Sequence, residues 1–332
     1  MKISIKTIAK LAGCSTATVS NVLNNKGMFS AKTRDKVLEI VRKNNFTINA
    51  AGRNLRTGKA ETVGITFYRP NADIFIHEFY QTMMGALERT MADNNYEIIL
   101  SEYTDTMLER KVLPPFLLKG KADGMIVLGG FPRETIKIFA EAPYPVVMLD
   151  SYAQNCDCVI TDGMESVENA MAEISKLGHA HADFFGFITP DYNTDMRIKG
   201  FLSGIEKFGF DKQKCKIHKN FSNLDSAVEE FDKTMSQKNK PSVIVACNDR
   251  LAVSLMAAAK SRGLKIPDDI AFVGFDDIYT ASMTTPSLST IHTDTYAMGR
   301  EAANILLNKI NNPGAKKVVK KVSTVFVRRA SL

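Results

Sequence analysis

Hydrophobic runs and helical patterns alternate along most of the chain. Short apolar runs predict strands at residues 63–67, 98–100, 125–128, 146–149, 184–188, 243–247 and 271–275. Apolar residues spaced three or four positions apart predict helices at residues 79–94, 107–119, 164–177, 196–208, 227–237, 251–262 and 295–311. Unbroken apolar runs are typical of strands buried on both faces, so this alternation predicts a doubly wound α/β body with parallel sheets.

The first sixty residues show only short helical patterns. Apolar spacing predicts helices at residues 5–12 and 16–24, with Gly13 ending the first of them. Ser30 is expected to cap a third helix. Two short helices joined by a glycine-containing turn are typical of a helix-turn-helix, although the same pattern also fits an ordinary helical hairpin.

Charge separates this opening segment from the rest of the chain. The net charge is +7, yet residues 1–60 hold eight Lys and four Arg against only Asp35 and Glu39, so they carry +10 while residues 61–332 carry −3. A basic segment ahead of a mildly acidic body indicates contact with nucleic acid or an anionic membrane in that segment alone. The charge therefore favours a helix-turn-helix over a plain hairpin.

Length and composition exclude several classes of protein. At about 150 residues per domain, 332 residues suggest two globular units, and 45% hydrophobic with 24% charged residues excludes a disordered chain. Five scattered cysteines without CxxC pairs favour a reducing compartment. Lys6 and Lys10 interrupt the apolar start before the lipoprotein-like Leu-Ala-Gly-Cys at residues 11–14, and no run of about 18 apolar residues follows. We expect a cytoplasmic protein without a membrane span.

Residues 49–59 predict a short basic helix between the head and the body. Leu55 is its one prominent apolar residue, and Arg53, Arg56 and Lys59 surround it. Helices shorter than about 12 residues are marginal in water, so this segment is expected to fold only when DNA neutralises its cations. The alternative is a plain linker between domains.

Polar residues follow three of the predicted strands. Asp150, the pair Asn248-Asp249 and the pair Asp276-Asp277 each come directly after an apolar run. The carboxyl ends of parallel strands converge on one crevice, where ligands of open α/β sheets bind. Each of these residues alone could be a turn or a helix cap, but three in register favour a site for a hydroxylated, sugar-like molecule.

Signals of catalysis are weak. The sequence has no GxSxG, no GxxxxGK[ST] and no GxGxxG, so acyl transfer, nucleotide hydrolysis and dinucleotide binding lack their usual motifs. His179, His181 and Asp183 alternate as strand residues on one face, but His179 belongs to a turn-like Leu-Gly-His sequence. Asp276 and Asp277 would face opposite sides of a strand. We expect no enzyme activity, no cofactor and no metal.

Several ordered motifs resemble the lactose-repressor (LacI/GalR) family. In the head they are the runs at residues 5–13, 17–20, 22–24 and 54–59, and in the body those at residues 177–179, 248–249, 273–277 and 329–331. The resemblance implies an N-terminal all-α helix-turn-helix head and a two-lobed α/β body similar to periplasmic binding proteins. The implied domains are residues 1–47, a hinge at 48–59 and a body at 60–332, with lobes at about 60–161 plus 292–321 and about 162–291 plus 322–332.

The resemblance also implies a homodimer that binds double-stranded DNA. The second helix of each head would lie in the major groove of one half of a near-palindromic operator, and Leu55 would wedge between base steps in the minor groove. Asn21 stands where the family most often has Arg, which suggests a preference for adenine. The residues expected to contact DNA are Thr7, Ser15, Thr16, Ala17, Thr18, Ser20, Asn21, Asn24, Asn49, Arg53, Leu55 and Arg56.

The implied function is a transcription regulator, most often a repressor, whose operator affinity is controlled by a small effector. The effector, a sugar or a sugar derivative, would lie between the lobes and change operator affinity allosterically. Its expected contacts are Phe79, Tyr80, Asp150, Arg197, Phe221, Asn248 and Asp276. A surface arginine and core aromatic residues are the alternatives for Arg197 and for the phenylalanines and Tyr80. Ser151 stands where the family often has Arg, so the effector's identity stays open.

An exported solute-binding protein of a transport system is the alternative class. Such a protein shares the two-lobed body, but it would need export and would have no helix-turn-helix.

Overall fold

The structure is a computed structural model that describes residues 3–23, 27–44, 46, 58–69, 74–187 and 192–332. Its contacts divide the chain into two units, Met1–Lys59 and Ala60–Leu332, which we call the head and the body. Each unit has its own hydrophobic core, so each is considered by itself.

Three helices form the described part of the head: α1 (Ile5–Ala12), α2 (Thr16–Leu23) and α3 (Ala31–Lys43). Ser4, Ser15 and Ser30 precede them, and each accepts a hydrogen bond from the backbone amide three residues later. This satisfies an amide that the helix itself leaves unpaired. The cap predicted at Ser30 is confirmed.

A small core holds the three head helices together. Gly13 ends α1 in the left-handed conformation (φ 69°), which turns the chain into α2. The buried residues that meet in this core are Ile8, Ala9, Ala12, Val19, Val22 and Val37. Phe46 packs against it from beyond α3, as a partly buried side chain. The predicted pair of short helices is present.

The first lobe of the body contains a six-stranded parallel sheet. Its strands are β1 (Thr62–Phe67), β2 (Glu97–Glu102), β3 (Met125–Leu128), β4 (Val146–Leu149), β5 (Asp157–Thr161) and β11 (Val319–Val322). They lie in the order β11-β5-β4-β3-β1-β2. The strand β11, which lies near the end of the sequence, therefore forms one edge of a sheet whose other strands all come from the first half of the body.

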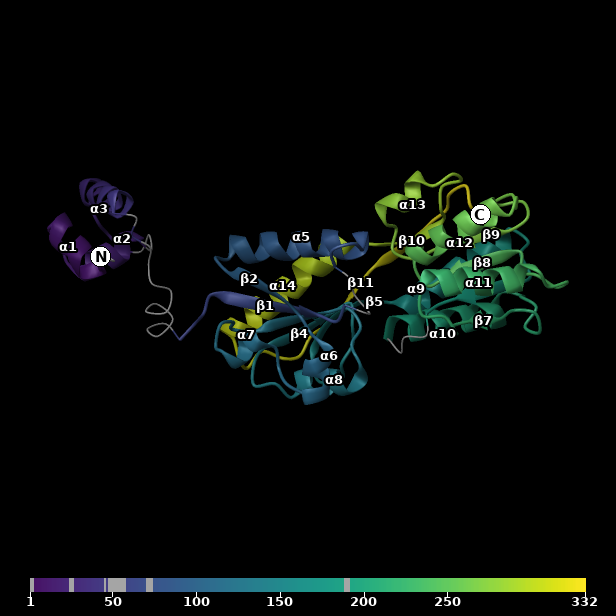
Figure 1. Ribbon diagram of the computed structural model, residues 1–332, viewed down its shortest axis with the longest axis horizontal. Coiled ribbons are helices and arrows are strands. Elements are labelled where there is room, and N and C mark those ends of the chain that lie inside the picture. The colour runs from purple at the N-terminus through teal and green to yellow at the C-terminus, as the bar shows by residue number, and fades with distance from the viewer. Residues whose placement is uncertain (1–2, 24–26, 45, 47–57, 70–73, 188–191) are drawn as a thin grey trace. The chain divides into compact units, whose positions relative to one another are not determined.

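Helices cover both faces of this sheet, which explains its unbroken apolar strands. On β3, Ile126 and Leu128 face the core that includes α5 (Glu78–Asp93) and α14 (Thr295–Asn311), whereas Met125 and Val127 face the opposite core. That opposite core includes α7 (Pro115–Leu118) and α8 (Arg133–Ala140). Figure 1 shows α5 and α8 on opposite sides of the strands.

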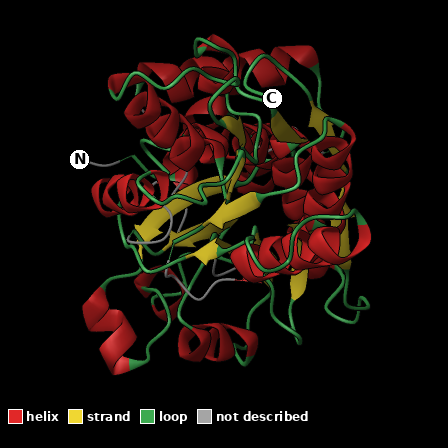
Figure 2. Cartoon of the chain, turned by 90° about the vertical axis from the view of Figure 1, so that its right-hand side faces the viewer, coloured by secondary structure: helices red, strands yellow, loops and turns green. Residues whose placement is uncertain are grey.

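The second lobe has a four-stranded parallel sheet in the order β7-β6-β8-β9. The strands are β6 (Ala182–Phe185), β7 (Ile217–His218), β8 (Val243–Ala246) and β9 (Ala271–Val273). The helices are α9 (Gly163–Lys176), α10 (Tyr192–Lys207), α11 (Leu224–Met235), α12 (Asp249–Ser261) and the short α13 (Tyr279–Met283). Figure 2 shows strands enclosed by helices. The predicted doubly wound body is confirmed.

Two features of the body differ from the sequence prediction. The single helix predicted at residues 107–119 is wrong: α6 (Asp105–Arg110) ends early and α7 starts at Pro115, because two consecutive prolines interrupt the backbone hydrogen bonds. The antiparallel pair of β10 (Thr290–Thr293) and β12 (Thr324–Val327) was not predicted, and neither were the parallel strands β5, β7 and β11. These short strands mix polar and apolar residues and lack the apolar run that marked the others.

The strand orders predict a crevice at the carboxyl end of the strands in each sheet. In the first lobe β1 lies between β2 and β3, and in the second lobe β6 lies between β7 and β8. Successive connections leave such a strand in opposite directions, and the crevice at its carboxyl end is where ligands of this architecture bind. The fold therefore directs attention to the residues that follow β3, β4, β6, β8 and β9.

Two glycines allow α10 to lie close against α9. A Cβ atom added at Gly200 would be 2.2 Å from the carbonyl oxygen of Met164, and one at Gly204 would be 2.4 Å from the Cβ of Met171. Real Cβ atoms do not approach so closely, so α9 and α10 would have to separate. The spacing matters for the site, because α10 also carries Arg197.

We predict that Gly200→Ala lowers the free energy of unfolding by about 1–3 kcal/mol, since overpacking a tight contact costs this much. Urea unfolding followed by circular dichroism measures the change. The matched control is Gly85→Ala in α5, where the added Cβ meets nothing within 4 Å. Alanine should raise the stability there by about 1 kcal/mol through its helix propensity. Equal effects of the two variants would contradict the close packing.

Candidate functional site

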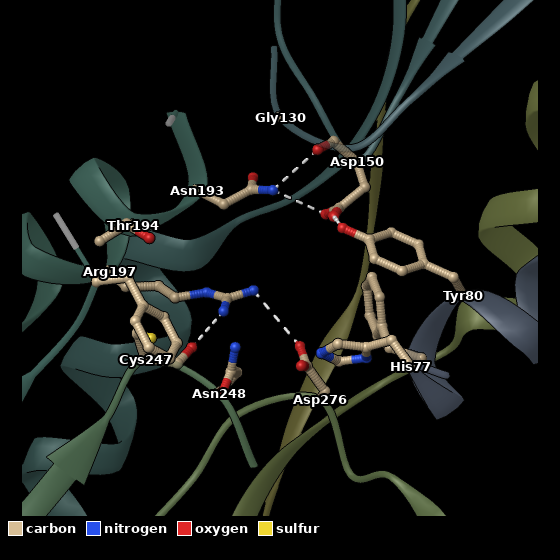
Figure 3. A pocket seen from close by; sticks show the side chains of 12 residues that line it. His77, Tyr80, Gly130, Asp150, Asn193, Thr194, Arg197, Cys247, Asn248 and Asp276 are labelled. Carbon is tan, nitrogen blue, oxygen red and sulfur yellow. Dashed lines mark hydrogen bonds and ion pairs between the residues drawn. The ribbon is translucent and has the colours of Figure 1, made fainter. Parts of the chain in front are cut away.

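A cleft lies at the carboxyl ends of the strands of both lobes (Figure 3). The volume of the cleft is about 120 Å³, and the cleft is partly open to solvent. Six lining residues follow strands: Gly130, Asp150, Phe187, Cys247, Asn248 and Asp276. Six others come from the starts of α5 and α10: His77, Phe79, Tyr80, Asn193, Thr194 and Arg197.

Arg197 is the central cation of the cleft. Its side chain is 8% exposed, one terminal nitrogen donates to the carbonyl oxygen of Cys247, and the other lies 3.5 Å from Oδ1 of Asp276. The guanidinium also lies over the ring of Phe275, 3.7 Å from the centroid. Its Nε is buried and donates to no protein atom in the described part of the chain. A buried donor of this kind favours a ligand that accepts a hydrogen bond.

Burial governs the acidity of the second-lobe carboxyl groups. It raises the pKa of Asp276 well above the usual range, while the positive charge of Arg197 opposes this and Asp249 and Asp150 add to it. Burial also raises the pKa of Asp249 to about 7, although Asp249 accepts hydrogen bonds from the Thr290 hydroxyl and the Ile278 amide. Asp249 thus supports the cleft from behind Asp276.

Asp150 is held on the first-lobe side of the cleft. The Tyr80 hydroxyl donates to its Oδ2 at 3.2 Å, and the Asn193 amide donates to its Oδ1 at 2.8 Å and to its carbonyl oxygen at 3.0 Å. Asn193 belongs to the second lobe, so this contact joins the two lobes across the cleft (Figure 3).

The backbone is strained at both acidic residues of the cleft. Asp150 has φ 56° and Asp276 has φ 115°, a region that residues other than glycine seldom adopt. Such conformations persist where the surrounding structure fixes them, and they concentrate at functional sites. The strain marks these two strand ends as parts of a built site.

Asn248 caps a helix with its side-chain oxygen and directs its side-chain nitrogen into the cleft. Its Oδ1 accepts a hydrogen bond from the Leu251 amide at 2.9 Å and so caps α12. Its amide nitrogen points into the cleft toward Arg197 (Figure 3). The cap fixes the side chain, so the amide can donate to a ligand with little loss of side-chain entropy.

Six of the seven residues predicted to contact an effector line this cleft: Phe79, Tyr80, Asp150, Arg197, Asn248 and Asp276. Phe221 is not among the lining residues. It is 2% exposed and packs edge to face behind Phe187, with 5.6 Å between the ring centroids. Phe187 therefore presents the aromatic surface that we had expected from Phe221.

Sequence analysis missed half of the lining residues. Gly130 could have been found by extending the strand predicted at residues 125–128, whereas Phe187 and Cys247 lie within the strands predicted at residues 184–188 and 243–247 and were not singled out there. Asn193 and Thr194 carry no such signal, because they start a helix and reach the cleft only through the packing of the two lobes.

The other histidine and aspartate residues singled out in the sequence contact partners outside the cleft. His179 Nδ1 lies 2.9 Å from the Ser242 hydroxyl, and His181 Nε2 lies 3.4 Å from Asp183. Asp277 pairs with Arg329 at 2.6 Å and with His292 at 3.0 Å. Among the described residues, no group of three His, Cys, Asp or Glu side chains is arranged to hold a metal ion.

The head presents a second candidate surface along α2. Ser15, Thr16, Ala17 and Asn21 are exposed there. Ser15 and Thr18 join their hydroxyls at 2.9 Å at the start of the helix. Small, uncharged polar side chains on a basic unit suit entry into a major groove. Of the other predicted contacts, Thr7 is exposed and Ser20 half-buried, while Asn24, Asn49, Arg53, Leu55 and Arg56 lie outside the described residues.

Known protein families match both the head and the body of the chain. Residues 4–49 match the family described as bacterial regulatory proteins, lacI family, and residues 172–332 match the periplasmic binding protein-like domain. The HTH-type transcriptional regulator DegA of Bacillus subtilis (strain 168) is 31% identical over 311 residues, which cover 91% of this chain and 89% of DegA. The chain belongs to the lacI family of bacterial regulatory proteins. The resemblance predicted from sequence is confirmed.

Other regulators match over nearly their whole length. The NTD biosynthesis operon regulator NtdR of Bacillus subtilis (strain 168) is 26% identical and covers 99% of both chains. The crystal structure of the lac repressor dimer bound to operator and the anti-inducer ONPF has a TM-score of 0.85 at 20% identity, and covers 100% of this chain and 99% of that one. The fold is that of a lacI-family transcription regulator. None of the described helices combines the length and apolar content that a bilayer span requires.

We predict a pH signature for the buried Asp249. Its pKa is raised to about 7 in the native state, so between about pH 4 and 7 the native protein binds a proton that the unfolded chain has lost. This carboxyl therefore makes stability fall as pH rises through that window, by up to about 1.4 kcal/mol per pH unit.

Urea unfolding of Asp249→Asn at several pH values tests this. The variant lacks the contribution of the Asp249 carboxyl to the fall in stability. The free energy of unfolding of the variant should therefore increase relative to that of the wild type as pH rises from about 5 to 7. Asp268→Asn, at an exposed position, serves as the control and should keep the wild-type profile. Parallel profiles for Asp249→Asn and the wild type would contradict the assignment.

Proposed function

We propose that this lacI-family regulator is a repressor whose hold on an operator is controlled by a neutral, hydroxylated effector bound in the cleft. One observation carries the proposal: Arg197, whose buried Nε has no hydrogen-bond partner among the described residues, lines a cleft at the strand ends of both lobes, in a chain that also has a helix-turn-helix head. We propose that the protein acts in the cytoplasm and does not chemically change the ligand.

The lining chemistry supports a neutral ligand. Arg197 is the single guanidinium of the described lining, and it is already paired with Asp276, while Asp150 adds a second carboxyl group. A phosphate or carboxylate would lie against both acidic side chains, which only accept hydrogen bonds when ionised, and would find the guanidinium of Arg197 already engaged by Asp276. Hydroxyl groups can both donate to the carboxylates and accept from Arg197 and Asn248. A sugar or a related polyol satisfies this pattern.

We propose that the chain works as a homodimer with one head on each half of a near-palindromic operator. In this scheme residues 48–59 form the hinge, and Asn49, Arg53, Leu55 and Arg56 contact DNA at the operator centre, where Leu55 wedges between base steps. The effector changes the angle between the lobes. This change in angle alters the fraction of hinges that are bound to DNA. The supporting relatives are named as operon and transcriptional regulators.

An exported solute-binding protein is the second candidate. The periplasmic binding protein-like domain is shared by that class. The match of residues 4–49 to the lacI family favours regulation, because a transport protein has no use for that head.

We predict that Asn21→Ala weakens operator binding selectively. The operator is first identified by selection from random DNA pools with the purified protein. Loss of one bidentate contact to a base costs about 1–3 kcal/mol, so operator affinity should fall about 5- to 150-fold. Affinity for random DNA should change little, because phosphate contacts dominate it. Fluorescence anisotropy measures both, and equal losses would refute base contact by Asn21.

We also predict that Arg197→Ala abolishes the response to the effector without weakening operator binding in its absence. The effector is identified by a thermal-shift screen of sugars, nucleosides and phosphorylated sugars, since a ligand of the native state raises Tm. Anisotropy titration of operator with and without the ligand then gives the response.

Arg197→Lys provides a second test if the alanine variant is unstable. Lysine keeps the charge opposite Asp276 but lacks the planar group that reaches Cys247 and the ligand together. Its ligand affinity should also drop. An unaltered ligand titration in a folded variant would remove Arg197 from the site.

A further inference from the structure

A second cavity adjoins the cleft of Arg197. Its volume is about 520 Å³, and it has Gly130, Asp150 and Asn193 in common with the cleft. The two spaces are therefore neighbouring compartments with one shared wall. The sequence analysis pointed to no residue of the second compartment except Asp150 and the altered position Ser151.

An aromatic platform distinguishes this second compartment. Tyr152, which follows β4 in the first lobe, stacks on Tyr192, the first residue of α10 in the second lobe. Their ring centroids are 4.8 Å apart and the planes are inclined by 25°. Both rings are half-buried, and both line the cavity. The face of an aromatic ring is electron-rich and attracts the C–H groups of a ring stacked on it.

The remaining lining is mixed: it includes the apolar residues Phe131, Ile136, Ala140 and Ala153, and its charged residues Arg133, Lys137, Asp150 and Asp195 balance in charge. Gln154 and Asn155 provide amides, and Arg133 lies 4.0 Å from Asp195 across the lobes. Amides and hydroxyls around an aromatic face are suited to a neutral ring with several hydroxyl groups. An anion would gain little, because each cation here has an acidic neighbour or is exposed to water.

The contact between Asn193 and Asp150 forms part of the wall between the two compartments, together with Gly130. Asn193 donates to Oδ1 and to the carbonyl oxygen of Asp150, and both residues face both compartments. A bond linking two rings of a ligand would cross at this point. Asn193 can then donate to the linking oxygen or to a neighbouring hydroxyl instead of to Asp150.

We propose that the two compartments form one extended site for a neutral disaccharide, with one ring between Arg197 and Asp150 and the second ring on Tyr152. The inference rests on the proposed function and narrows the effector from a polyol in general to a ligand of two sugar rings. It makes Tyr152 a specificity-determining residue.

Isothermal titration of the full chain tests the proposal with matched sugars: glucose against maltose, cellobiose and trehalose, and galactose against lactose and melibiose. At least one disaccharide should bind about tenfold more tightly than its monosaccharides, the gain expected of a stacked ring. Adenosine and uridine form a separate arm, because a nucleoside also has two rings.

Variants at Tyr152 localise the second ring. Tyr152→Ala should weaken the best disaccharide about tenfold and leave its monosaccharide nearly unchanged, whereas Tyr152→Phe keeps the ring face and should retain the affinity. Tyr296→Ala, at an exposed position of α14 that does not line the described cavities, is the control and should bind as the wild type does.

Several results would overturn the proposal. They are a monosaccharide or a nucleoside as the tightest ligand, equal losses for disaccharide and monosaccharide in Tyr152→Ala, or no heat of binding with any sugar of the set. Each leaves the proposed regulator intact if the selected operator is still bound and Arg197→Ala still removes the response to the ligand of the thermal-shift screen. Loss of selective operator binding by the wild type would instead refute the regulator itself.

Discussion

The buried guanidinium of Arg197 constrains the whole second-lobe wall of the cleft. Removing a charge from water costs several kcal/mol unless partners replace the lost hydration. The carbonyl oxygen after β8 and the carboxylate after β9 supply those partners, and the Phe275 ring covers the guanidinium. These partners are all needed at once, so α10 and the two strand ends hold one arrangement. Nε has no hydrogen-bond partner among the described residues.

The first-lobe wall is built differently, because its acidic group depends on the other lobe. Asp150 accepts from Asn193 of α10, and on another side of the body Glu78 accepts from the backbone amide of Thr280 at 3.0 Å. Each such hydrogen bond contributes about 1 kcal/mol net. The total is comparable with the coupling of about 1–3 kcal/mol typical of allosteric proteins. Exchanging even one contact for a ligand can therefore change how the lobes are held.

Most of the fold could be predicted from the sequence, because buried parallel strands leave long apolar runs and helices leave a clear period. The same logic found Asp150, Asn248 and Asp276, since strand ends of a doubly wound sheet converge. It failed where position depends on packing between distant segments. Asn193, at the start of α10, donates to Asp150 of the other lobe, and no local pattern in the sequence indicates this contact. The two phenylalanines Phe187 and Phe221 are a second example. The sequence does not distinguish them, but in the structure Phe187 lines the cleft and Phe221 packs edge to face against it in the core.

A ligand shifts a two-state equilibrium only by its difference in affinity for the two states. A molecule that contacted Arg197 and Asn248 alone would bind equally well at any angle between the lobes, since both residues belong to the second lobe. An effective ligand must also contact Asp150, Tyr80 or Tyr152 on the first lobe, so its polar groups must face both walls at once. A rigid ring with hydroxyl groups around its edge meets this requirement. A small ion or a ligand with one polar end does not, whatever its affinity for Arg197.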